Sequence, residues 1–173
     1  MSKTEVKKYL KTLSQDEMLE TLLSLYSSSK EAKNFLEFIV NPNPKEKLEE
    51  YKTILNNEFY PKRGEPKCRL SVCRKAINEF KKLGVEPSLL ADLLVFHAEL
   101  GARFTADYGD MEEAYYTSFE NHYLTTCEFL YKNDLIEHFK DRLHRIIEIT
   151  EGCGWGFHDT LCEIYYEHVD GDE

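Results

Sequence analysis

Apolar side chains recur every third or fourth residue along almost the whole chain of 173 residues. This spacing places them on one face of an α-helix, whereas a half-buried β-strand needs strict alternation, which is nearly absent here. A clear case follows Pro87, where leucines stand at positions 90, 93, 94 and 100. We therefore expect an all-α fold of about eight or nine helices, arranged as consecutive antiparallel hairpins in an α-solenoid or a compact bundle.

The length of the chain favours one domain, since domains usually hold about 100–200 residues. We expect a single helical domain over residues 1–173 with four parts. These are short N-terminal helices over 1–57, a loop at about 56–66, long helical hairpins over 67–169 and an acidic tail over 170–173.

Two serines near the N-terminus have the spacing of helix capping boxes. Ser2 precedes Glu5 by three residues, and Ser14 precedes Glu17 by three. In such a box each side chain accepts a hydrogen bond from the other residue's backbone N–H. We expect each serine to begin a short helix.

Composition indicates a cytoplasmic protein. The mean hydropathy is −0.54, and no uncharged apolar run reaches the ~18 residues of a membrane span. The N-terminus lacks the apolar segment of a secretory signal. The five cysteines form an odd, scattered set, which is typical of reduced thiols rather than of a disulfide framework.

Charge is distributed unevenly along the chain. Its 22 basic and 32 acidic side chains give a net charge of −10, which argues against general nucleic-acid binding because phosphates repel a net anion. Residues 105–173 carry −13, whereas residues 58–82 carry +5. Within the second segment, a basic island over residues 62–75 includes Arg69 and Arg74. Arginines near a helix start can bind an anion or a nucleic acid weakly, or they can pair with the acidic half of the same chain.

The segment from Gly152 to Asp159 is the most unusual in the chain. It combines three glycines with the only tryptophan, a cysteine, a histidine and an aspartate. One hypothesis is that Trp155, His158 and Asp159 line the pocket of a small enzyme or ligand-binding protein. The alternative is a tight interhelical turn in which Trp155 and Phe157 fill the core.

Motifs for metal, cofactor or catalysis are not apparent. His158 and Cys162 are four residues apart, but the paired spacing of a structural zinc site is missing. The chain has no metalloprotease motif, no phosphate-binding loop and no nucleophile elbow. His97 stands among leucines, a position typical of a hydrogen-bonded core histidine. We expect no metal site, no cofactor and no catalytic set.

Three segments of the chain resemble a bacterial family that is classed only as a domain of unknown function. They are SKTEVKKYL from Ser2, RLSVCRK from Arg69 and GWGFHDTLC from Gly154. The resemblance covers essentially the whole chain and implies a stand-alone cytoplasmic bacterial protein. It supplies no activity, so it assigns no catalytic residues.

The leading expectation is a non-enzymatic interaction or scaffold module. Tyrosine is favoured at protein interfaces because it buries a large area and keeps a polar tip, and the acidic half is rich in it. Candidate contact residues are Arg69, Arg74, Tyr115 and Tyr166. The expected partner is another protein, with no membrane and no obligate small molecule.

Overall fold

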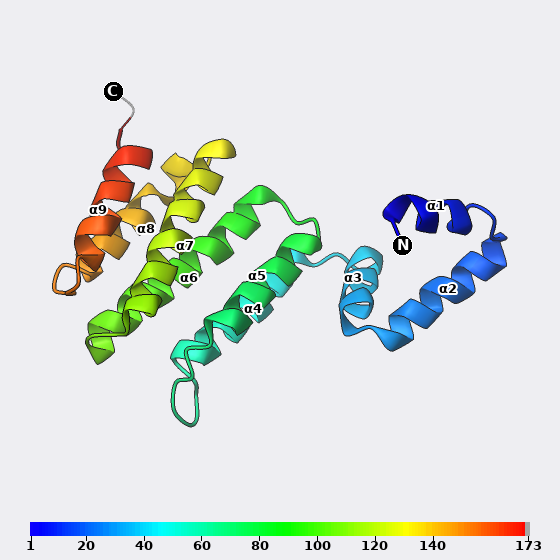
Figure 1. Cartoon of the computed structure of the whole chain (residues 1–173), viewed down its shortest axis with the longest axis horizontal. Coiled ribbons are helices and arrows are strands. Elements are labelled where there is room, and N and C mark those ends of the chain that lie inside the picture. Colours follow the sequence, from blue (N-terminus) through cyan, green and yellow to red (C-terminus); the bar gives the residue numbers. More distant parts are fainter. Residues whose placement is uncertain (172–173) are drawn as a thin grey trace. The chain divides into compact units, whose positions relative to one another are not determined.

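The computed structural model describes residues 1–171, and within them the chain forms nine α-helices and no β-strand (Figure 1). The predicted all-α fold is confirmed. Contacts divide the chain into two compact units, Met1–Asn43 and Pro44–Glu173. This division concerns contacts within the chain. The expectation of a single domain over residues 1–173 stays a prediction.

The first unit consists of three short helices. They are α1 (Lys3–Leu10), α2 (Gln15–Ser28) and α3 (Lys30–Val40), and α2 packs against α3. No residue of these helices is buried. This unit therefore has helices but no interior.

Side-chain caps define where these helices begin. The Ser2 hydroxyl accepts from the Glu5 N–H at 3.3 Å, and the Glu5 carboxylate accepts from the Ser2 N–H at 2.6 Å. Ser14 and Glu17 repeat this arrangement, so both predicted capping boxes are confirmed. The two caps satisfy backbone donors that a helix start leaves without partners.

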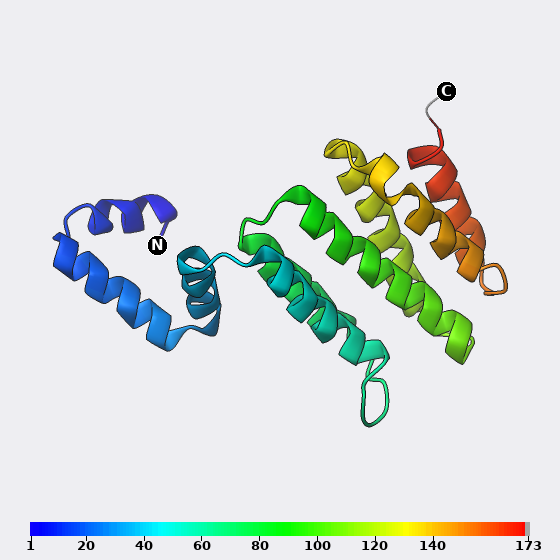
Figure 2. The same ribbon diagram turned by 180° about the vertical axis from the view of Figure 1, so that it is seen from behind.

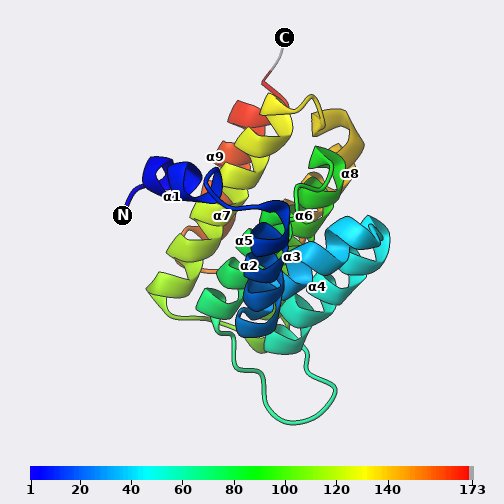
Figure 3. The ribbon, with the colours of Figure 1, turned by 90° about the vertical axis from the view of Figure 1, so that its right-hand side faces the viewer.

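The second unit consists of six helices in two layers. They are α4 (Pro44–Phe59), α5 (Leu70–Lys82), α6 (Pro87–Tyr108), α7 (Glu113–Lys132), α8 (Ile136–Ile149) and α9 (Phe157–His168). One layer holds α5, α7 and α9, which are nearest the viewer in Figure 1. The other holds α4, α6 and α8, which are nearest in Figure 2, and Figure 3 shows the two layers from the end. Consecutive helices thus form three antiparallel hairpins, packed as a compact helical bundle.

The centre of this unit is α6. It contacts α4 and α8 in its own layer and α5 and α7 in the other, and its buried residues include Leu93, Val95 and Leu100. At Gly101 the backbone of α6 lies directly against the ring of Phe119 on α7, which occupies the space of any larger side chain at 101. Glycine is therefore what lets these two helices approach so closely.

One predicted boundary differs from the structure, and the predicted tail lies partly outside the described residues. The loop expected at about 56–66 begins later, because α4 continues to Phe59, whose side chain is fully buried. Burial of this aromatic residue outweighs the turn signals of the sequence around it. In the predicted tail, Asp170 forms an ion pair with Lys140 at 2.7 Å, while residues 172–173 lie outside the described part of the chain.

Candidate functional site

The glycine-rich turn between α8 and α9 contains two consecutive residues in the left-handed backbone region. Trp155 and Gly156 both have left-handed φ angles, of 61° and 73°. Phe157 is buried, as expected for a residue that fills the core, but Trp155 is 77% exposed. The expectation that Trp155 fills the core is therefore wrong. The left-handed backbone at 155 turns the chain before α9 begins, and Phe157 alone enters the interior.

Hydrogen bonds within the protein account for both ring nitrogens of His158. Its Nδ1 lies 3.1 Å from the Ile147 carbonyl oxygen, and its Nε2 lies 3.4 Å from Cys162 Sγ. Because a carbonyl only accepts, Nδ1 donates the hydrogen bond to Ile147. His158 thus links α8 to α9, while Asp159 is exposed in the first turn of α9.

Metal ligands do not gather at this turn or elsewhere in residues 1–171. No group of three or more His, Cys, Asp or Glu side chains there has the arrangement of a metal site. Burial raises the pKa of all five cysteine thiols, to about 12 for Cys73. These thiols are protonated at neutral pH and are poor nucleophiles.

The two arginines predicted in the basic island differ in their surroundings. Arg69 donates to both carboxylate oxygens of Glu58, from Nε at 3.0 Å and from Nη2 at 2.7 Å. These hydrogen bonds hold the pKa of Glu58 below its ordinary value. Arg69 is therefore occupied in closing the loop between α4 and α5. Arg74 is exposed and makes no hydrogen bond or ion pair within the described chain.

The two predicted tyrosines also differ. Tyr115 is buried, and its hydroxyl donates to the Gly101 carbonyl oxygen at 2.9 Å. Its position offers little surface to a partner. Tyr166 is 56% exposed on α9 and remains available for contact.

A cleft lies between α5 and α7, with α6 at its base. Its volume is about 700 Å³, within the range of small-molecule sites. The residues that line it are Leu70, Arg74, His97, Glu113, Ala114, Thr117, Ser118, Asn121, His122 and Thr125. Of these, sequence reasoning singled out only Arg74 as a binding residue.

His97, at the base of this cleft, is buried as expected but is not hydrogen-bonded. Neither of its ring nitrogens has a partner, and neither is reached by solvent. Leaving such a group unsatisfied costs about 1–3 kcal/mol. Burial lowers the pKa of His97 well below its ordinary value, with smaller effects from His122 and Arg74, so the ring is neutral.

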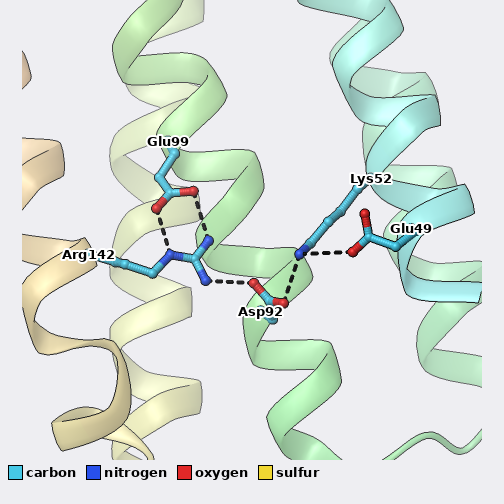
Figure 4. A network of polar contacts seen from close by, with 5 residues as sticks. All are labelled: Glu49, Lys52, Asp92, Glu99 and Arg142. Carbon is cyan, nitrogen blue, oxygen red and sulfur yellow. Dashed lines mark hydrogen bonds and ion pairs between the residues drawn. The ribbon is translucent and has the colours of Figure 1, made fainter. Parts of the chain in front are cut away.

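An ionic network links the helices of the other layer (Figure 4). Arg142 on α8 donates to both carboxylate oxygens of Glu99 on α6, at 2.7 and 2.8 Å. It also contacts Asp92 at 2.6 Å, and Lys52 on α4 contacts the same carboxylate at 2.8 Å. The network joins one helix from each of the three hairpins, and no motif in the sequence indicates it.

Exposed apolar side chains gather on the first unit. Those that are large and exposed are Met1, Val6, Tyr9, Met18, Leu19, Leu22, Leu23, Leu25, Phe35, Ile39 and Val40. We call this set the N-terminal apolar surface. Isolated exposed leucines are ordinary, but here the exposed apolar side chains are concentrated on 43 residues that bury none.

One known protein family matches nearly the whole length of the chain. Residues 1–168 match a family described as being of unknown function, DUF6155. The chain belongs to that family. No curated protein and no solved structure matches this DUF6155 chain. Within the described residues, none of its helices is both long enough and apolar enough to cross a membrane.

Proposed function

We propose that this chain is a protein-interaction module and that it associates through the N-terminal apolar surface with a second copy of itself. The observation that carries the proposal is that α1, α2 and α3 expose large apolar side chains and bury none. Helices of this length are marginal in water without tertiary packing. Contact with a partner would supply that packing.

Charge favours a second copy as the partner. Residues 1–13 carry +3, residues 14–28 carry −3 and residues 29–43 are neutral. In a two-fold dimer each surface meets itself, so a basic α1 can face an acidic α2 in both directions. The rest of the chain carries the full net charge of −10, so contact elsewhere between two copies is opposed by repulsion.

The test is the mass of the protein in solution. Leu19 and Leu23, one helical turn apart on α2, are each changed to Glu in a double variant. We expect the wild type to sediment as a dimer at about 50 µM and the double variant as a monomer that loses at most the helical content of α1, α2 and α3, because the second unit keeps its own buried core. The matched control changes Tyr131 and Tyr166, which are exposed on α7 and α9, to Glu, and it stays dimeric.

The outcome that overturns the proposal is a monomeric wild type at that concentration. Equal dimerisation of both double variants would do the same, because it would place the interface elsewhere. The control also tests Tyr166. If the variant with Tyr131 and Tyr166 changed to Glu is monomeric, the contact between copies lies on the second unit instead.

We also propose that the module acts in the cytoplasm. Support comes from the five cysteines, which are all free thiols in the described chain. A reducing compartment keeps such thiols unpaired. We further propose binding rather than catalysis, in keeping with the structural hydrogen bonds that occupy Arg69 and His158.

A further inference from the structure

We infer that the cleft between α5 and α7 binds a small molecule bearing an oxyanion group, a carboxylate or a phosphate. This inference is independent of the proposed self-association, because every residue that lines the cleft lies in the second unit. It rests on a buried histidine without partners, an unpaired arginine and a row of hydrogen-bonding side chains along α7.

The first step is the lack of partners for His97. Its imidazole is neutral, so it presents one N–H donor and one acceptor nitrogen. Aromatic rings surround it, with the Phe119 and His122 centroids at 5.1 and 4.4 Å. Buried polar groups are nearly always hydrogen-bonded, and one that is not calls for an explanation such as a missing ligand. The ring of His97 is among the groups that line the cleft, so a ligand bound there is the nearest candidate partner for its nitrogens.

The second step is the state of His122. Its Nε2 lies 2.9 Å from the Leu94 carbonyl oxygen, so this nitrogen donates the hydrogen bond. Burial lowers the pKa of His122, only partly opposed by that hydrogen bond, so the ring is neutral. Its Nδ1 is then an acceptor. Two neutral imidazoles thus stand together at the inner wall of one cleft.

The third step is the charge of the cleft. Arg74, from the second turn of α5, is its one cation, and this guanidinium has no ion-pair partner in the described chain. A guanidinium binds a carboxylate or phosphate through two parallel hydrogen bonds. Thr117, Asn121 and Thr125 follow one face of α7. The Thr125 hydroxyl and one Asn121 amide hydrogen already donate to backbone carbonyls of α7, which leaves the second Asn121 amide hydrogen and the Thr117 hydroxyl to donate to a polar ligand.

The cleft also contains one carboxylate, Glu113 in the first turn of α7. Its negative charge repels an anion. A change at Glu113 therefore tests the sign of the ligand's charge independently of Arg74. Removing the Glu113 charge should strengthen the binding of an anion and weaken the binding of a cation or zwitterion.

Calorimetric titration with inorganic phosphate and, separately, with succinate tests the inference and distinguishes the two anions. We expect saturable binding of at least one probe at millimolar concentration. Arg74→Ala should weaken it by about tenfold, and Glu113→Gln should strengthen it a few-fold. Arg145→Ala, which removes an exposed arginine on α8 outside the cleft, should leave it unchanged.

His97→Phe keeps a ring of similar size and removes both nitrogens, so it should abolish binding while the thermal melt shows a folded protein. Absence of saturable binding of both probes up to about 20 mM, a dissociation constant that corresponds to only ~2.3 kcal/mol, would overturn the inference. Equal affinity in the wild type and Arg74→Ala would also overturn it. Neither result depends on whether the chain is a dimer.

Discussion

At the scale of single residues, the surroundings of His97 follow only in part from the sequence. The leucines around it in sequence predict that it is buried, and it is 3% exposed. The absence of a hydrogen bond could not be predicted, because the space around the ring is filled by Phe59 and Phe119 from other helices. A sequence indicates which face of a helix is covered, but not which atoms cover it.

The unsatisfied ring leads to a prediction about stability. His97→Phe should raise the free energy of unfolding by about 1 kcal/mol, because the variant buries no unpaired polar atom. The gain stays small because phenylalanine is slightly larger and the site is tightly packed. Urea denaturation measures the change. The control His122→Phe, which loses the bond to Leu94, should instead lower stability by a similar amount. A clear loss of stability in His97→Phe would contradict this account.

At the scale of helices, most elements follow from local patterns. Capping serines and the spacing of apolar residues indicated the starts of α1 and α2, and Pro87 indicated the start of α6. The ionic network around Arg142 was not predictable, since its members come from α4, α6 and α8 and the partners in one ion pair are up to 50 residues apart in the sequence. The cleft was missed for the same reason: its walls come from three helices.

The contact between α6 and α7 gives a second prediction. Gly101→Ala should destabilise the protein by about 2 kcal/mol, although alanine is the better helix former by up to ~1 kcal/mol, because its methyl group collides with the Phe119 ring. Urea denaturation reports the change. In the double variant Gly101→Ala/Phe119→Leu the two effects should not add, because the smaller side chain relieves the collision. Strict additivity would show that the collision does not determine the cost.

At the scale of the whole molecule, stability depends on pH through ionisable groups that lie far apart in the sequence. His97 and His122 have lowered pKa values, chiefly through burial. Burial alone would raise the pKa of Asp92, but its hydrogen bonds to Lys52 and Arg142 outweigh this and lower it. The pKa of Glu58 is lowered chiefly by the hydrogen bonds from Arg69. All four groups bind protons more readily in the unfolded chain.

We therefore expect stability to fall in two stages as the pH is lowered. The first begins near pH 6.5, where histidine takes up a proton in the unfolded chain but not in the folded one. The second begins near pH 5 and continues below pH 4, as the unfolded chain protonates carboxylates that the folded chain keeps ionised. Urea midpoints between pH 8 and pH 3 measure both stages.

Two variants separate the stages. His97→Phe should flatten the first stage and leave the second, whereas Arg142→Met should reduce stability at pH 7 and flatten part of the second. Stability that stays constant between pH 7 and pH 5.5 in the wild type would show that the two histidines are not held neutral.

The hairpin architecture of the second unit has a kinetic consequence. Each of its helices packs mainly on the helices next to it, or next but one, along the chain. Native contacts therefore form between segments that are close in sequence, and closing the short connections costs little entropy. Helical proteins of this kind reach the native state in microseconds to milliseconds. The polypeptide from Pro44 onward should thus fold rapidly, hairpin by hairpin, as it leaves the ribosome.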